Sequence, residues 1–249
     1  AITPLVLLFE IKKFKSEFRS DNKIFINLSI LIGISLFLGS ALQQVALLHT
    51  DVANAAFFTI FYVPMVPIII FLFKRTSIHW SVWPSVVLCL IGGYLLTNFY
   101  DATVRLGDSL VILGALFWST HIIFTGIIVK KYDFPLTIGA VQTLIVASLS
   151  FVIALIYEEF IFIEIMKEIN SILYAGILSG GFAFVLQIYA QKNIAPAPAA
   201  IIFSLEGVFA TIAAWYILNQ ILDINNLLGC LFILCGVLLS QLLLSLIHI

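Results

Sequence analysis

Residues 198–218 read PAAIIFSLEGVFATIAAWYIL and contain one charged side chain, Glu206. A helix needs about 20 predominantly apolar residues to cross the roughly 30 Å hydrocarbon core of a bilayer, and this run has that length. The composition agrees, because 62% of the 249 residues are hydrophobic and 10% are charged, whereas soluble domains have about 45–50% apolar and about 25% charged residues. We therefore expect a protein made almost entirely of membrane-spanning helices.

Seven further apolar runs are bounded by charged or turn-forming residues and are long enough to cross. They cover 24–48, 53–73, 80–97, 109–129, 137–157, 171–190 and 226–248. A shorter run, 1–11, ends at two lysines and is interpreted as the tail of a ninth helix. It is not a signal peptide, because such a peptide carries its positive charge before the apolar region. The predicted fold class is an all-α polytopic membrane protein with eight full helices and one clipped helix.

Lysine and arginine are unevenly distributed between alternate connections. The connections at 12–23, 74–79, 130–136 and 191–198 carry ten of the twelve basic residues. By the positive-inside rule these connections are cytoplasmic, which also places the C-terminus inside a plasma (inner) membrane. The net charge of −1 lacks the basic field of a nucleic-acid binder, so no nucleic-acid partner is expected.

The sequence aligns with itself at a shift of 143 residues. Gln44 falls on Gln187 and Gly93 falls on Gly236, and the ends of the apolar runs coincide along the alignment. The shift spans five predicted helices, which is an odd number, so corresponding helices cross in opposite directions. This arrangement is the inverted-topology repeat that is typical of secondary transporters.

Several motifs together resemble the EamA-type transporters of the drug/metabolite transporter superfamily. They are DVANAAF at 51–57, YVPMVP at 62–67, GALFW at 114–118 and AAIIFSLE at 199–206. The resemblance implies an inverted-repeat carrier of ten helices that moves small metabolites, often amino acids or related solutes, and frequently moves them outward. Gly207 departs from the family pattern, in which many members have proline, and this changes the expected bend of that helix.

The resemblance and the repeat together define two predicted domains. Residues 1–99 are the first EamA repeat, truncated at its N-terminus, and residues 107–246 are the second repeat, with inverted topology. Counting two sets of five, we expect ten helices in the complete protein.

Glu206 is the only acidic residue inside a predicted span. It follows Ala199 by seven residues, which places it about 10 Å into the membrane at about 1.5 Å per residue. A charge at the centre of a spanning helix costs about 2.5–3.5 kcal/mol. Two hypotheses stand equally: Glu206 binds a cationic substrate group or a coupling proton, or it is a protonated or hydrogen-bonded carboxyl that joins neighbouring helices.

Gly114, Trp118, His121 and Thr125 lie on one face of the predicted helix 109–129, because they are spaced by three or four residues. Trp118 could stack on a substrate or a cation, and His121 could bind or release a proton near neutral pH. The alternative is helix packing, in which Gly114 permits close approach. For His121 we favour packing.

The remaining binding candidates are Asn54, Tyr62, Gln44, Gln142 and Gln187. Asn54 and Tyr62 share a face of the run 53–73, where packing is favoured over a ligand role for the aromatic residue. The three glutamines supply amides that bind polar solutes, or that join helices through hydrogen bonds worth about 0.6 kcal/mol each.

Proline should distort the run 53–73. Pro64 and Pro67 lie within it and lack the backbone N–H that a helix interior requires. We therefore expect a bend there, with backbone carbonyls freed beside a cavity.

The predicted function is secondary transport of a small metabolite, an amino-acid-like or related polar or amphipathic solute, by alternating access, with export as the favoured direction. A channel is the first alternative, although no filter sequence is visible. An intramembrane enzyme is less favoured, because all aspartates lie in connections and no nucleophile and base converge. No catalytic residue, metal or cofactor is predicted. The expected partners are a small-molecule substrate, membrane lipid and a coupling proton, and the oligomeric state is left open.

Overall fold

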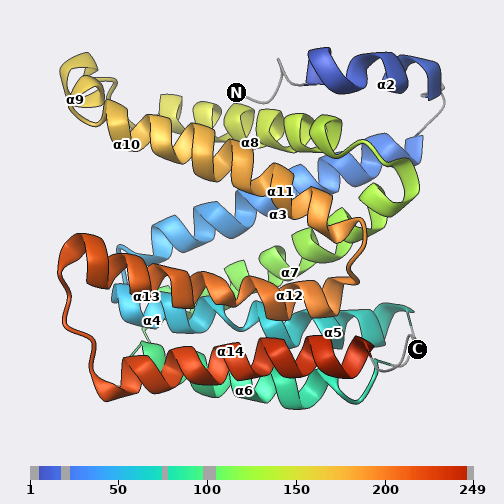
Figure 1. Ribbon diagram of the computed structural model, residues 1–249. Helices are drawn as coiled ribbons and strands as arrows, with labels where there is room; N and C mark the ends of the chain where they lie inside the picture. Colours follow the sequence, from blue (N-terminus) through green and yellow to red (C-terminus); the bar gives the residue numbers. More distant parts are fainter. Residues whose placement is uncertain (1–5, 18–22, 75–77, 98–104, 246–249) are drawn as a thin grey trace. The chain divides into compact units, whose positions relative to one another are not determined.

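The computed structural model describes residues 6–17, 23–74, 78–97 and 105–245, and all regular structure in these ranges is helical (Figure 1). In chain order the helices are η1 (Val6–Glu10), α2 (Ile11–Glu17), α3 (Lys23–Ala46), α4 (Val52–Thr59), α5 (Tyr62–Lys74), α6 (Val82–Leu96), α7 (Leu106–Tyr132), α8 (Pro135–Tyr157), α9 (Phe162–Lys167), α10 (Ile169–Leu173), η2 (Tyr174–Ala183), α11 (Phe184–Gln191), α12 (Pro196–Phe203), α13 (Leu205–Leu218) and α14 (Ile224–Ser245). Here η marks a π-helix.

Seven helical segments of the described chain are long and apolar enough to cross a membrane. They are Lys23–Ala46, Val52–Phe73, Leu106–Tyr132, Pro135–Tyr157, Ile169–Gln191, Pro196–Ile217 and Ile224–Leu243. Each of them corresponds to one predicted run, so the all-α polytopic class is confirmed. The eighth predicted run, 80–97, forms a shorter apolar helix in the described residues.

The exception is α6, which has 15 residues. The run 80–97 was expected to be helical from its start, but the helix begins only at Val82. Before it, the imidazole Nδ1 of His79 lies 2.7 Å from the Ser81 hydroxyl and accepts a hydrogen bond from the Ser81 backbone N–H. These local contacts hold a turn at this point. Hydropathy alone could not detect this turn, because the apolar side chains of Trp80 and Trp83 lie on either side of Ser81 and continue the apolar run.

The N-terminal run is helical from Val6 and continues to Glu17, past the lysines that end its apolar part. Lysine has a high helix propensity, so its charge ends the apolar surface and not the helix. Residues 1–5 of the predicted run lie outside the described ranges.

Two of the long segments are broken. In the first, Ile60 and Phe61 separate α4 from α5. Pro64 has no N–H to donate to the Ile60 carbonyl four residues earlier, and that carbonyl instead accepts a bond of 2.9 Å from Val63. The interruption predicted for this run is therefore present, and it lies just before Pro64.

The second break separates α12 from α13 at Ser204 and has no proline at this point. The Ser204 N–H is shared between the carbonyls of Ala200 and Ile201, at 3.3 and 3.2 Å. The Ser204 hydroxyl also donates to Ile201, at 2.6 Å. Such tightened turns and side-chain bonds to the preceding turn bend helices. Gly207, which takes the place of the family's proline, donates its N–H to Ser204 at 3.2 Å.

By packing, the chain divides into two units, each made of two sequence segments. Unit 1 comprises Ala1–Phe37 and Phe124–Ile194, and unit 2 comprises Leu38–Ile123 and Ala195–Ile249. The core of unit 1 contains Phe25, Ile32, Ile128, Val129, Phe134, Ile138 and Ile188. One core cluster of unit 2 contains Ala46, Ala55, Phe58 and Val111.

In unit 2, α6 and α14 pack along their length (Figure 1). A Cβ atom placed on Gly92 would lie 2.7 Å from the carbonyl oxygen of Gly229, and one placed on Gly229 would lie 2.7 Å from the carbonyl oxygen of Gly92. The two backbones therefore touch at this crossing, which only glycine permits.

Candidate functional site

Glu206 lies in the first turn of α13, two residues after the break at Ser204. Within the segment Pro196–Ile217, ten residues precede it and eleven follow it. At about 1.5 Å per residue it is about 15 Å from either end of the segment. This is deeper than the predicted 10 Å, because the helix begins at Pro196 and not at Ala199. Glu206 is at the middle of the span.

The Glu206 side chain is exposed, and it makes no hydrogen bond or ion pair with any residue that the structure describes. Of the two sequence hypotheses, a carboxyl that joins helices through hydrogen bonds requires a protein partner. The described residues of unit 2 offer no such partner. Both a protonated carboxyl and a carboxyl that binds a solute or a proton are compatible with this arrangement.

Tyr62 is the first residue of α5 and follows the other break. Its side chain is 4% exposed, and its hydroxyl is buried without a hydrogen-bond partner in the described part of the chain. Tyr62 and Glu206 thus each follow a helix break within unit 2.

Helix α6 explains how the two breaks come together. Gly93 lies against Ile60 of the first break, where a Cβ would collide with the Cδ1 atom of Ile60. Cys89 accepts a hydrogen bond of 3.4 Å from the hydroxyl of Ser204, in the second break. Cys89 and Gly93 are four residues apart and share one face of the helix. Both breaks therefore pack on the same face of α6, and α12 packs against α5 beside them.

Trp118 and His121 lie on α7 with their ring centroids 6.2 Å apart in an edge-on arrangement. His121 is fully buried. A Cβ on Gly39 would lie 3.2 Å from the Trp118 indole, and one on Gly114 would lie 3.4 Å from the Gly39 carbonyl oxygen. At Gly39 and Gly114, α3 therefore packs closely against α7.

The amide candidates are spread over both units. In unit 2, Asn54 is buried on α4 and Gln44 is exposed on α3. The neighbouring Gln43, and not Gln44, connects the two helices by donating to the Thr59 hydroxyl at 3.3 Å.

In unit 1, Gln142 is fully buried on α8 and Gln187 is partly buried on α11, two helices that pack together. These amides belong to a different unit from Glu206 and Tyr62.

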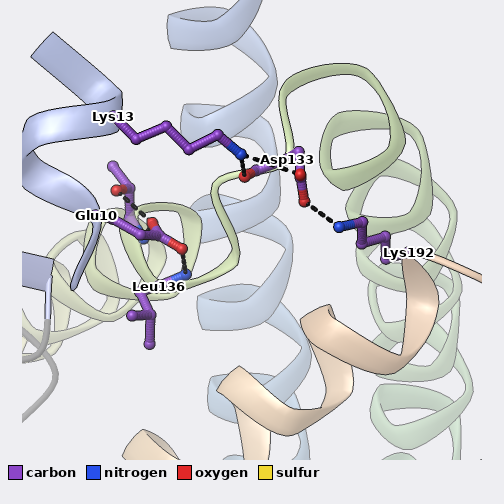
Figure 2. A network of polar contacts seen from close by, with 6 residues as sticks. Glu10, Lys13, Asp133, Leu136 and Lys192 are labelled. Carbon is purple, nitrogen blue, oxygen red and sulfur yellow. Dashed lines mark hydrogen bonds and ion pairs between the residues drawn. The ribbon is translucent and has the colours of Figure 1, made fainter. Parts of the chain in front are cut away.

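Sequence reasoning missed a charged network at one end of unit 1, shown in Figure 2. Asp133, in the turn between α7 and α8, forms ion pairs with Lys13 at 3.0 Å and with Lys192 at 2.6 Å. Hydrogen bonds from Lys192 and then Lys13 lower the pKa of Asp133, and the bond to Asp133 raises the pKa of Lys192. The lysines were read only as topology markers, because nothing in their spacing indicates that they meet.

Next to this network, Glu10 of η1 caps the N-terminus of α8 (Figure 2). Its carboxylate accepts hydrogen bonds from the backbone N–H groups of Leu136 and Thr137, at 3.0 and 2.8 Å, and from the Thr137 hydroxyl at 2.8 Å. A carboxylate is favoured at this position because the first N–H groups of a helix lack intrahelical partners. The partner residues are more than 120 positions away in sequence, so local capping rules could not predict it.

Within the described ranges, no group of three or more His, Cys, Asp or Glu side chains is placed to hold a metal ion. The polar groups at the two breaks and on the facing side of α6 are the carboxylate of Glu206, the phenol of Tyr62, the hydroxyl of Ser204 and the thiol of Cys89. Such a set can bind a solute and exchange a proton.

The fold and this site define a multi-pass helical membrane protein with a polar centre at two helix breaks. Residues 105–242, more than half of the chain, match the EamA-like transporter family. The chain belongs to this family and is a membrane transporter, as its motifs suggested.

Similar proteins agree with this assignment. An uncharacterized transporter of Archaeoglobus fulgidus is 30% identical over 217 residues, which cover 85% of this chain and 67% of that protein. The uncharacterized transporter YoaV of Bacillus subtilis is 28% identical over 138 residues, which cover 55% of this chain and 47% of YoaV. A solved crystal structure with 14% identity superposes with a TM-score of 0.80 over 97% of this chain and 82% of the other, which shows a shared fold.

Proposed function

We propose that this transporter moves a small, amino-acid-like or related polar or amphipathic solute by alternating access, with export as the favoured direction, and that Glu206 binds the cationic group of the solute or a coupling proton. The observation that carries this proposal is an exposed carboxylate at the middle of a broken span, without a protein partner among the described residues. A charge at that depth costs about 2.5–3.5 kcal/mol. Binding a cation or a proton offsets that cost.

The two helix breaks support the proposed inverted repeat. Phe61 in the first break and Ser204 in the second are 143 residues apart, which is the shift that aligns the sequence with itself. In secondary transporters, discontinuous helices at corresponding positions of the two halves form the substrate site near the middle of the membrane. This supports two repeats of inverted topology, at 1–99 and 107–246.

The charged network supports the proposed orientation. Lys13, Asp133 and Lys192 come from three connections that were assigned to the cytoplasm by their basic residues, and they contact one another at one end of unit 1. Three connections that meet at one end belong on one side of the membrane. We therefore propose that this end and the C-terminus face the cytoplasm of a cell bounded by the plasma (inner) membrane.

The test is transport by the purified full-length protein in proteoliposomes, with a panel of amines, amino acids and neutral metabolites, with and without a pH gradient. Glu206→Gln should lower kcat/KM for cationic solutes at least about tenfold, since it removes the charge that binds them. The matched control is Glu164→Gln on the exposed helix α9, which should leave transport unchanged. Unchanged transport and pH dependence in Glu206→Gln would remove Glu206 from the mechanism, and single-channel currents without saturable uptake would favour the channel alternative.

A further inference from the structure

The Tyr62 hydroxyl is a buried polar group that the packing of unit 2 leaves without a partner. A hydroxyl that loses water on burial and gains no hydrogen bond destabilises the fold, and the great majority of buried polar side-chain atoms in proteins are paired. The same ring with no hydroxyl, phenylalanine, is abundant in this chain, which has 22 of them. The hydroxyl at this position therefore calls for a role outside packing.

The surroundings of Tyr62 indicate what that role is. Tyr62 follows the break at Ile60 and Phe61, Glu206 follows the break at Ser204, and both breaks pack on the face of α6 that carries Cys89 and Gly93. Beside these breaks, α12 packs against α5. One uncharged donor and one anionic group thus lie in the same part of unit 2.

We propose that Tyr62 is a specificity-determining residue, whose hydroxyl donates a hydrogen bond to an acceptor on a transported solute while the cationic group of that solute lies at Glu206. This rests on the proposed function of Glu206 and adds a second point of recognition. The solute then carries a cation and, a few bonds away, an oxygen that accepts a hydrogen bond. A plain alkylamine satisfies Glu206 and leaves the phenol unpaired, so the site discriminates against it.

Access to the hydroxyl follows from the helix break. Tyr62 is 4% exposed, so a solute reaches it only when the packing of α5 on α6 rearranges. The break at Ile60 and Phe61 lies directly before Tyr62, and an interrupted helix can move as two rigid pieces about such a point. The hydroxyl becomes available in the conformation that admits the solute.

The test uses two pairs of amines in which an ether oxygen replaces a CH₂ group of the same chain: 2-methoxyethylamine against butylamine, and 3-phenoxypropylamine against 4-phenylbutylamine. The ether oxygen accepts a hydrogen bond and cannot donate one, and the two pairs differ in size. Uptake into proteoliposomes is measured for the wild type, for Tyr62→Phe and for Tyr216→Phe. Tyr216 is an exposed residue of α13 and serves as the matched control for loss of a hydroxyl.

We expect the wild type to prefer the ether over its methylene analogue about five- to tenfold in kcat/KM, mostly through KM, as one hydrogen bond allows. Tyr62→Phe should remove this preference, and Tyr216→Phe should keep it. A purely structural hydroxyl would not affect the preference, because both ligands of a pair have the same shape.

An equal preference in the wild type and in Tyr62→Phe overturns the role of Tyr62, while uptake that depends on Glu206 leaves the proposed function standing. If the wild type takes up none of the four amines, the cationic-solute proposal fails and the role of Tyr62 fails with it. If Tyr62→Phe does not fold, the thermal stabilisation of the wild type by each amine decides. Equal stabilisation by ether and methylene ligands then overturns the inference.

Discussion

Replacing Gly229 by alanine should destabilise the transporter markedly. The added Cβ would lie 2.7 Å from the Gly92 carbonyl oxygen, 2.7 Å from the Leu96 backbone nitrogen and 3.0 Å from the Leu96 Cα. All three neighbours are backbone atoms of α6, so no side chain can rotate away. Ordinary carbon contacts are about 3.5–4.0 Å, and α14 would have to move away from α6 by a large part of that difference.

The magnitude follows from two opposing effects. Alanine in place of glycine inside a helix stabilises by roughly 0.5–1 kcal/mol, whereas overpacking a well-packed contact costs typically 1–3 kcal/mol. Because the three nearest atoms belong to the backbone and cannot rotate away, we expect the upper part of that range and a net loss of about 1–2 kcal/mol. Gly176 is the matched control, since a Cβ there would meet no atom within 4 Å, and Gly176→Ala should be neutral or stabilising.

The assay is thermal or denaturant unfolding of the purified variants in the same detergent or lipid nanodisc. Gly229→Ala should unfold at lower temperature than the wild type, and Gly176→Ala should not. Equal stability of the two variants would refute the conclusion that α6 and α14 touch through their backbones at this crossing.

Three further changes test other contacts. Asp133→Asn removes the charge and keeps a residue that tolerates the positive φ of 49° at this turn. It should lower the free energy of unfolding by about 0.5 kcal/mol, a small amount because the ion pairs are exposed and screened. Since the pKa of Asp133 is lowered in the folded protein, its contribution is present above the ordinary carboxyl pKa and is lost as pH falls through the lowered value; unfolding at several pH values should show the variant and the wild type converging only in acid. Glu10→Ala should lower the unfolding free energy by about 1–2 kcal/mol, since it removes the cap of α8, and Glu10→Gln, which keeps one acceptor oxygen, should lose less; no loss in either would argue against the cap. Pro64→Ala gives Ile60 a backbone donor and should straighten the break; proteoliposome uptake should fall while the unfolding temperature does not, and unaltered uptake would show that the break is dispensable for transport.

The helices themselves were largely predictable. Each crossing segment is an apolar run of sufficient length, and hydropathy records this without reference to the rest of the chain. The start of α6 was not predictable, because the His79 and Ser81 contacts that delay it involve polar side chains next to apolar tryptophans. The position of the break in α12 and α13 was hidden for a similar reason, since a serine hydroxyl and not a proline accompanies it.

The candidate site divides in the same way. Glu206 was identifiable from sequence because an acid in an apolar run is costly wherever the helix packs. The proposed role of Tyr62 could not be identified from sequence, because tyrosine in a span is equally compatible with packing. Its unpaired hydroxyl results from the way that α5 lies on α6. The ion pairs of Lys13 and Lys192 with Asp133 could not be predicted either, because counting charges in each connection does not show which connections meet.

Sequence alone determined the membrane class, the spans to within a few residues, the family resemblance and the position of Glu206 in the middle of an apolar run. These properties depend on local composition and on the cost of placing each residue in hydrocarbon, and both are additive along the chain. Tertiary structure alone decided that two helix breaks meet on one face of α6, that the Tyr62 side chain is buried, and that Glu10 caps a helix more than 120 residues away. Those outcomes depend on contacts between distant segments, and the distance between segments in space is not encoded in the order of residues along one helix.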